Sequence, residues 1–228
     1  MRRLETEDMV ISYLEFEEIV NGIEPDEKSV IVVEVHSWDF EKKKILEEKG
    51  FCFHDRILNV EVGTKLKTNH KIESQFFKLV VGNDFDEVVK QLAHEVFFYD
   101  SRFHFDRIPN RIKGNKVIDA FLDNCGREGF RIVKCMHDND LMGFIILKDN
   151  GNNTATNMLG AVKQDCHGKM SVPFLYGGTL EMLASEGITK EFGTISASNV
   201  ASINLHFQLG GRLVNTTDKY IRRICDER

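Results

Sequence analysis

The chain has 228 residues, of which 42% are hydrophobic and 29% charged, a balance that predicts a globular protein with a substantial core. Its 30 lysine and arginine residues are outnumbered by 36 aspartate and glutamate residues, and no basic block occurs, so nucleic acid is not expected as a partner. The N-terminus mixes both charge signs, and no apolar run reaches the ~18 residues of a membrane helix. We therefore expect neither signal peptide nor membrane contact, and a cytoplasmic location.

Cysteine and histidine spacing gives no sign of a metal site. The five cysteines are scattered, and none stands at the spacing of a metal-binding pair or a disulfide framework. The nearest histidine cluster, His104 with Asp106, fits an alternating polar strand as well as a ligand pair. We expect reduced thiols and no metal.

The first part of the chain predicts a small α/β unit. Val30–Val35 is a β-branched run typical of a strand, and Glu41–Lys49 has the composition of a helix that ends at Gly50. Phe51–Val62 is rich in aromatic and β-branched residues, which indicates one further strand or a pair of strands.

The pattern changes after residue 82, which predicts two domains, residues 1–82 and 83–228. Asp84–His94 and Lys116–Cys125 are predicted to be amphipathic helices, and the connection between them, Phe97–Ile112, is irregular, aromatic and basic. Loops this long inside compact domains are uncommon and tend to be functional. The connection is therefore a candidate substrate-contacting segment, with a surface excursion of no role as the alternative.

The remainder predicts strands alternating with helices, and hence an α/β fold with a mixed sheet. The expected elements are a hairpin of Arg131–Met136 and Met142–Leu147, a strand Thr154–Val162, a helix Ser171–Ser185, a strand Phe192–Ala197, a helix Asn199–Leu209 and a strand within Leu213–Ile221.

The turn before the helix at Ser171 has the form of a phosphate-binding site. Here a strand leads through the sequence CHGKMSV, residues 166–172, into a helix. Such a turn presents backbone N–H groups and the positive end of a helix dipole to a pyrophosphate. Alone the signal is weak, because the turn is neither a Walker sequence nor a dinucleotide-binding GxGxxG.

In the next unit, a strand leads through Ser198 and Asn199 into a helix ending in HFQLGG. The phosphate-binding turn followed by this unit resembles the Gcn5-related N-acetyltransferase (GNAT) superfamily. That family has a pyrophosphate loop of the form Q/R-x-x-G-x-G/A, followed by an Asn-led helix ending in Tyr-x-x-x-Gly. Two departures stand out: of the loop glycines only Gly168 is present, and His206 replaces the tyrosine. The resemblance implies a GNAT fold with a smaller, partial GNAT-like N-terminal domain, and acetyl-CoA as co-substrate.

The resemblance also implies roles for individual residues. His206 stands where the family has the group that protonates the departing CoA thiolate, and an imidazole near pKa ~6.5 is partly protonated at neutral pH. The alternative is an exposed residue and a thiolate that leaves unassisted. Backbone N–H groups near Gly160 hold the acetyl carbonyl. The expected acetyl-CoA contacts are Gly160, Ala161, Val162, His167, Gly168, Lys169, Met170, Ser171, Val172 and Asn199.

A finer resemblance is to the TDP-fucosamine acetyltransferase branch, carried by the sequence YDSRF at residues 99–103 and by the N-terminal unit. It implies transfer to the amine of a nucleotide-linked amino-deoxy sugar. Arg102 is a candidate for binding the diphosphate, with a structural salt bridge as the alternative, and Phe103 is a candidate for stacking, with a core position as the alternative. The general base stays open, with Glu95 or Asp100 acting through water as candidates.

Two other functions stay open. The acceptor can be a peptide or another small-molecule amine, although the arginines of the candidate acceptor segment favour an anionic one. The chain can also be a non-catalytic acyl-CoA-binding module, which the glycine-poor loop and the missing tyrosine favour. A homodimer is expected only by analogy with the family.

Overall fold

A continuous sheet of ten strands organises the chain, in the order β1-β2-β3-β10-β4-β9-β8-β7-β6-β5. The computed structural model describes residues 2–7, 9–23, 29–65, 76–97, 100–105, 111–166 and 171–224. The strands are β1 (Arg2–Glu5), β2 (Val10–Leu14), β3 (Ser29–His36), β4 (Cys52–Gly63), β5 (Lys78–Gly82), β6 (Arg131–His137), β7 (Asp140–Gly151), β8 (Thr154–Val162), β9 (Lys190–Ser196) and β10 (Arg212–Arg223). The helices are α1 (Phe16–Val20), α2 (Phe40–Glu48), α3 (Glu87–Val96), α4 (Arg111–Arg127), the short η1 (Gln164–Cys166), α5 (Ser171–Ser185) and α6 (Val200–Gln208).

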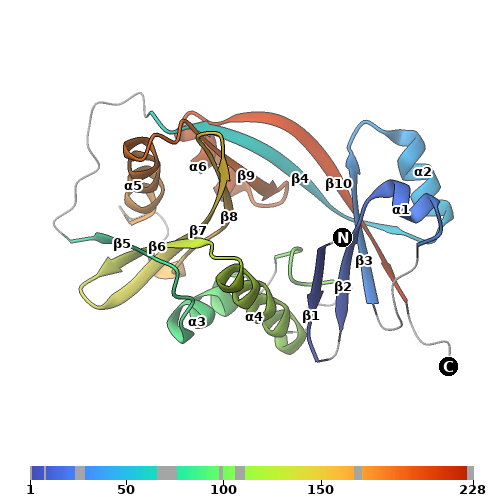
Figure 1. Cartoon of the computed structure of the whole chain (residues 1–228), viewed down its shortest axis with the longest axis horizontal. Helices are drawn as coiled ribbons and strands as arrows, with labels where there is room; N and C mark the ends of the chain where they lie inside the picture. The colour runs from blue at the N-terminus through green and yellow to red at the C-terminus, as the bar shows by residue number, and fades with distance from the viewer. Residues whose placement is uncertain are drawn as a thin grey trace.

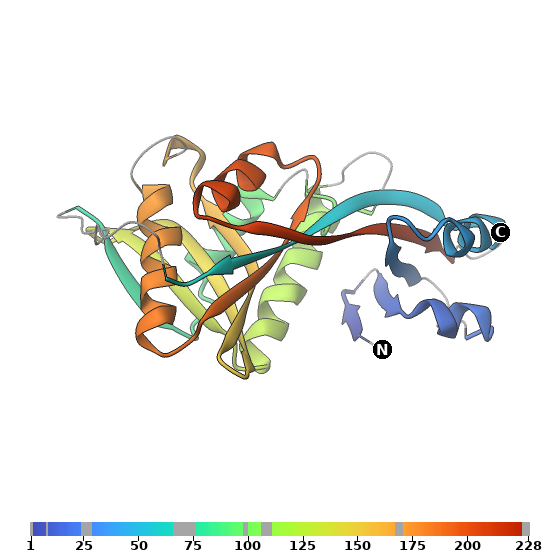
Figure 2. The same cartoon turned by 90° about the horizontal axis from the view of Figure 1, so that it is seen from above.

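The last strand, β10, lies between two strands from the first part of the chain. It pairs antiparallel with β3 on one side and with β4 on the other. Figures 1 and 2 show β4 and β10 as a long twisted ribbon that joins the end of the molecule carrying α1 and α2 to the end carrying α5 and α6. Two pairs are parallel, β2 with β3 and β8 with β9, and the remaining ladders are antiparallel.

Helices cover both faces of the sheet, as the alternating burial of the strands requires. Helices α3 and α4 pack on one face of β6, β7 and β8, whereas α5 packs on the opposite face of the same strands (Figure 1). A third apolar cluster joins α1 and α2 to β3 and includes Tyr220 from β10. None of the helices in the described ranges is both long and apolar enough to cross a membrane.

The predicted α/β fold with a mixed sheet is confirmed, and the predicted helices and strands each overlap an observed element of the same type, with ends that differ by up to five residues. The sequence analysis missed β1, β2, α1 and β5, which are only four or five residues long. β5 pairs with β6, and β10 pairs with β3, so ladders cross the predicted boundary after residue 82. The division into two domains stays a prediction.

A buried carboxylate on β10, that of Asp218, binds side chains from residues 37–56. Asp218 is 2% exposed and accepts hydrogen bonds from Arg56 at 2.7 and 3.0 Å and from Ser37 at 2.6 Å, and it forms an ion pair with Lys43 at 2.5 Å. Burial alone would raise the pKa of Asp218, but these donors outweigh it and hold the pKa well below its ordinary range. The carboxylate therefore fastens α2 and β4 to the last strand.

We expect Asp218→Asn to lower the free energy of unfolding at pH 7 by about 3 kcal/mol, because it leaves the buried Lys43 without its anion. The depressed pKa means that this stabilisation is present above the unfolded pKa of about 4 and is lost as the pH falls below it. Urea unfolding from pH 7 down to pH 3 would then show the two proteins converging. The exposed Asp140→Asn is the control, and an equal loss in both variants would contradict the assignment.

Candidate active site at the splayed strands

Two parallel strands separate in the middle of the sheet. β8 and β9 pair only through Thr154–Asn157 and Lys190–Gly193. Beyond that point β8 continues along β7 and β9 continues along β4, so the two strands diverge. We call the gap that opens after Asn157 and Gly193 the splay.

A β-bulge lies where the splay begins. Ile146 and Leu147 on β7 face Leu159 and Asn157 on β8, which leaves Met158 as an extra residue. Within the described chain, no strand pairs with β8 on the splay side of residues 158–162. The backbone of the predicted contacts Gly160, Ala161 and Val162 therefore borders the opening.

Two helices begin at the open end of the splay, because α5 follows β8 and α6 follows β9. The predicted contact Ser171 is the first residue of α5, is buried, and donates to the carbonyl of Cys166, and Val172 packs against the core beneath α5. The predicted contact Asn199 caps α6, with its side-chain oxygen 3.0 Å from the backbone nitrogen of Ser202. Both helices direct the positive ends of their dipoles to the same end of the site. The predicted contacts His167, Gly168, Lys169 and Met170 lie outside the described residues.

Tyr176 on α5 reaches across β8 at the splay. Its hydroxyl lies so close to Gly160 that a Cβ added there would be 2.2 Å from the oxygen. Burial, together with the charge of Glu191, raises the pKa of Tyr176 to about 12, whereas the charge of Arg102 acts in the opposite direction. The hydroxyl therefore keeps its proton at neutral pH, and the sequence analysis assigns no role to this residue.

His206 on α6 meets the Tyr176 ring edge-on, with 5.8 Å between the ring centroids. Its Nδ1 lies 2.7 Å from the carbonyl oxygen of Ser202, so Nδ1 carries the proton, and Nε2 offers a lone pair toward Gly193. Burial lowers the pKa of His206, although the hydrogen bond to Ser202 opposes this shift. The role proposed from the sequence needs a protonated ring, and burial works against that form.

A buried acid, Glu191 on β9, faces the same space. It is 5% exposed, accepts a hydrogen bond from Asn157, and its Oε1 has no hydrogen-bond partner among the described residues. Burial raises the pKa of Glu191 to about 7, and the hydrogen bond from Asn157 opposes this only in part. A carboxyl that titrates near neutral pH can take up and release a proton during a reaction.

The other side of the splay is bordered by residues 100–105, which follow α3 in the chain. The Ser101 hydroxyl donates to Asp55 on β4, and the Ser196 hydroxyl at the end of β9 donates to the same carboxylate at 3.1 Å. A bulge in the β4–β10 ladder leaves His54 as an extra residue, and His54 Nε2 lies 2.8 Å from the carbonyl oxygen of Ser101. This segment is therefore held beside the open end of β9.

The predicted acceptor residue Arg102 is engaged within the protein. Its Nε and Nη2 atoms bind Asp100 at 2.9 and 2.6 Å, and its guanidinium lies 5.5 and 5.8 Å from the rings of Phe97 and Phe103. The structural salt bridge considered as the alternative is thus present, and it occupies one bidentate edge of the guanidinium. The predicted stacking residue Phe103 is 4% exposed and packs against Phe97 and Phe121, which is the core position considered as its alternative.

The two bases suggested from the sequence do not share the environment of Glu191. Burial would raise the pKa of Asp100, but its ion pair and hydrogen bonds with Arg102 hold that pKa below its usual value, which makes it a poor base. Glu95 is exposed on α3. Glu191 lies just before the predicted strand Phe192–Ala197 and stands in no motif, so no pattern in the sequence singles it out.

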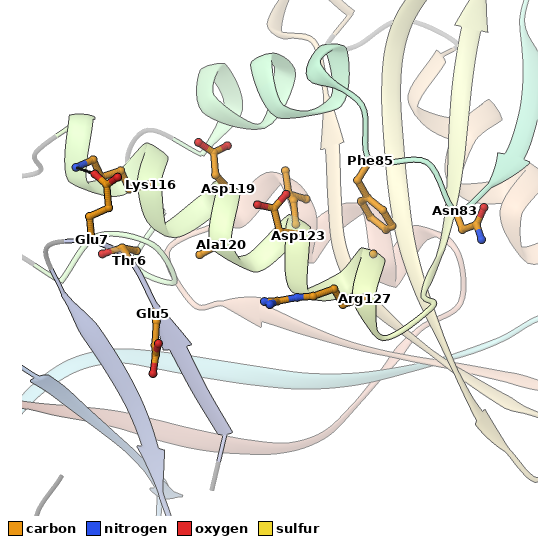
Figure 3. Close-up of a pocket in the computed structure, with 12 residues that line it drawn as sticks. Glu5, Thr6, Glu7, Asn83, Phe85, Lys116, Asp119, Ala120, Asp123 and Arg127 are labelled. Carbon is orange, nitrogen blue, oxygen red and sulfur yellow. Dashed lines mark hydrogen bonds and ion pairs between the residues drawn. The ribbon is translucent and has the colours of Figure 1, made fainter. Parts of the chain in front are cut away.

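A groove of about 1100 Å³ lies elsewhere, between β1 and α4. Figure 3 shows Lys116 on α4 beside Glu7 in the turn after β1, where the two side chains meet at 3.2 Å, and Asp119, Asp123 and Arg127 farther along α4. The groove contains none of the predicted site residues and marks the seam between the N-terminal hairpin and α4. Among the described residues, no three His, Cys, Asp or Glu side chains are grouped to hold a metal ion.

We expect Gly160→Ala to destabilise the protein by about 2 kcal/mol, because the new methyl group would overlap the Tyr176 hydroxyl. Gly193→Ala is the matched control, since its Cβ would meet neighbours only at 3.5 Å or more. Thermal or urea unfolding measures both. Adding Tyr176→Phe to Gly160→Ala should recover most of the loss, and no recovery would mean that the hydroxyl does not lie over Gly160.

We expect Glu191→Gln to stabilise the protein at pH 8 by about 3 kcal/mol, because ionising the buried acid costs free energy in the folded state. The folded pKa is raised, so the wild type is relatively most stable below pH 4.5 and loses stability up to about pH 7. Urea unfolding from pH 4.5 to 8 should show the variant gaining over this window. A pH-independent difference, or the same gain in the exposed Glu95→Gln, would contradict the burial of this charge.

No family model and no curated protein matches the sequence. Solved structures are similar in fold. A GCN5-related N-acetyltransferase from Sphaerobacter thermophilus has a TM-score of 0.58 at 9% identity, over 92% of this chain and 64% of that one. A tandem GNAT protein from the clavulanic acid biosynthesis pathway has a TM-score of 0.57 at 11% identity, over 87% and 65%.

An acetyltransferase of the GNAT family from Colwellia psychrerythraea is also similar, with a TM-score of 0.52 at 12% identity, over 85% of this chain and 65% of that one. The chain thus spans slightly less than two thirds of the length of each of these three structures. At this identity the likeness concerns architecture, and the mixed sheet with its splayed parallel pair has the GNAT fold.

Proposed function

We propose that the protein is an acyl-CoA-dependent N-acyltransferase that works at the splay. The observation that carries this proposal is the early end of the β8–β9 ladder, which opens a gap where two helices begin and where Tyr176, Glu191 and His206 meet. The names of the similar structures, which are N-acetyltransferases or GNAT proteins, support the same class. Acetyl-CoA is the proposed donor.

The residues at the splay fit an acyl-CoA. The unpaired backbone edge of β8 beside the bulge at Met158 offers hydrogen-bonding groups to a pantetheine chain and a thioester carbonyl. The start of α5 and the cap of α6 at Asn199 offer N–H groups and positive dipole ends to phosphates. A bound acyl-CoA supplies the activated acyl group.

The side chains divide the proton chemistry between them. Glu191 takes the proton from the attacking amine, because its pKa near 7 leaves part of it ionised and able to hold a proton. Tyr176 donates a hydrogen bond to the sulfur as negative charge develops there, and a hydroxyl with a pKa of about 12 does so without ionising. His206 packs against the Tyr176 ring. Its alternative role is to protonate the departing CoA thiolate.

The acceptor proposed from the finer sequence resemblance is a nucleotide-linked amino-deoxy sugar. The segment 100–105 that carries part of this resemblance borders the open end of β9 through Ser101, Asp55 and Ser196, which supports its contact with an acceptor. A peptide or another small-molecule amine is the second class to be tested.

We expect calorimetry to detect micromolar binding of acetyl-CoA. When TDP-linked amino sugars, spermidine and lysine peptides are offered as acceptors, mass spectrometry should detect a product that is one acetyl group heavier.

Tyr176→Phe and Glu191→Gln should each lower kcat on the order of 100-fold with acetyl-CoA affinity retained. His206→Phe should lower kcat only if that ring donates a proton. Tyr220→Phe is the control for the hydroxyl, because Tyr220 hydrogen-bonds Glu47 far from the splay.

The outcomes separate the alternatives. Binding of acetyl-CoA without transfer to any amine would indicate a non-catalytic acyl-CoA-binding module. Absence of binding to acetyl-CoA and to longer acyl-CoA would exclude the splay as an acyl-CoA site. Full activity in Tyr176→Phe and Glu191→Gln would remove both side chains from the mechanism and leave the backbone edge of β8 as the catalytic feature.

A further inference from the structure

The side chain that donates to Glu191 stands where the sheet opens. Asn157 is the last residue of β8 in the β8–β9 ladder, and the bulge at Met158 follows it directly. In that ladder Asn157 lies opposite Gly193 and Ala155 lies opposite Glu191, so the side chains of Asn157 and Glu191 project from the same face of the sheet. Gly193 has no side chain to stand beside Asn157. The amide of Asn157 therefore reaches diagonally to the carboxyl group of Glu191 and donates a hydrogen bond to it.

The surroundings of this pair are uncharged at neutral pH. Asn157 is 8% exposed and Glu191 is 5% exposed. On the same face, β4 contributes two buried valines, and α5 contributes Tyr176, which keeps its proton. Helix α6 contributes His206, whose ring is mostly neutral because burial lowers its pKa. No charged group among the described residues shifts the pKa of Glu191, which responds to burial and to Asn157 alone.

We propose that Asn157 is a positioning residue, which holds the Glu191 carboxyl group as the base of the reaction by donating this hydrogen bond. The inference rests on the proposed function, because it concerns the base of that same reaction. The hydrogen bond fixes the carboxyl group at the point where the ladder ends. Oε1 of Glu191 has no hydrogen-bond partner among the described residues, so it can accept the proton of the attacking amine.

The hydrogen bond also decides how much of the base is ready at neutral pH. A hydrogen bond donated to a carboxyl group favours the ionised form, so Asn157 lowers a pKa that burial raises. Without this donor, burial acts unopposed, and the carboxyl group stays protonated to a higher pH. A protonated carboxyl group cannot take a proton from an amine, so the loss of Asn157 is expected to act through Glu191.

A test that does not depend on catalysis measures the pKa of Glu191 by NMR in the full chain, isotopically labelled at the glutamate side-chain carboxyl carbon. The Glu191 resonance is assigned by its loss in Glu191→Gln. Asn157→Leu keeps the size of the side chain but cannot donate, and it should raise the pKa of Glu191 by about one unit, a tenfold change in its dissociation constant. Asn157→Ala replaces it if the leucine variant fails to fold. An unmoved pKa, or an equal shift in the exposed Asn150→Leu, overturns the proposal.

The pH dependence of kcat/KM separates positioning from a structural role. One amine is used for all proteins, so its own ionisation cancels when variant and wild type are compared. If the pKa of Glu191 moves from about 7 to about 8, Asn157→Leu should be about fivefold less active than wild type at pH 7 and nearly equal to it at pH 9. A loss by the same factor at every pH would assign Asn157 a structural role and overturn the proposal.

A double variant tests whether Asn157 acts through Glu191. In the Glu191→Gln background, Asn157→Leu should leave the residual kcat/KM unchanged, whereas independent roles would multiply the two losses and contradict the proposal. The NMR result keeps this inference distinct from the proposed function. A raised pKa of Glu191 in a protein that acetylates no amine would support the hydrogen bond from Asn157 while the proposed function fails.

Discussion

The β8–β9 ladder ends after four residues on each strand because both strands follow other partners, β7 and β4, which lead apart. A parallel pair cannot stay hydrogen-bonded once its outer neighbours diverge, so the sheet opens at its centre. The gap leaves backbone groups of β8 without a strand partner and lets side chains from α5, α6 and β9 meet. Every functional feature described above depends on this opening.

Charge is distributed unevenly around the opening. Carboxylates such as Asp218 and Asp100 are buried with enough donors to keep them ionised. Glu191, in contrast, lies at the opening and is buried with a hydrogen bond from Asn157 and with an Oε1 that has no partner among the described residues. Fully paired carboxylates stabilise the fold. A partly paired carboxyl group such as that of Glu191 lowers the stability of the fold and can bind a ligand. Such a loss of stability at a site is common where chemistry requires it.

Local patterns in the sequence predicted most of the fold. Apolar periodicity and glycine stops located the helices from Glu41 onward, and β-branched runs located the central strands, because these signals depend on neighbouring residues alone. The first strand, β1, has three charged residues among its four and carries no such signal, and the apolar run of β2 is only five residues long. The insertion of β10 between β3 and β4 could not be predicted either, since strand order depends on contacts between residues about 180 positions apart.

The outline of the candidate site comes from the sequence and stays a prediction, whereas its side chains could not be predicted. The order of the motifs predicts that Gly160, Ser171 and Asn199 lie close together, because each unit is a strand, a turn and a helix that follow each other along the chain. No motif singles out Tyr176 within its predicted helix, and Glu191 lies just before the predicted strand Phe192–Ala197. Only the tertiary arrangement places one of them across β8 and the other beneath the helices.

The position of β10 has a consequence for how the chain folds. Until residues 212–223 are available, β3 and β4 each present an open edge, and the ladders that close them join segments distant in sequence. Such contacts raise the contact order, which slows folding, and leave partly folded chains exposed to edge-to-edge association. During synthesis β3 and β4 therefore stay unpaired along these edges until residues 212–223 have left the ribosome, so the sheet closes late.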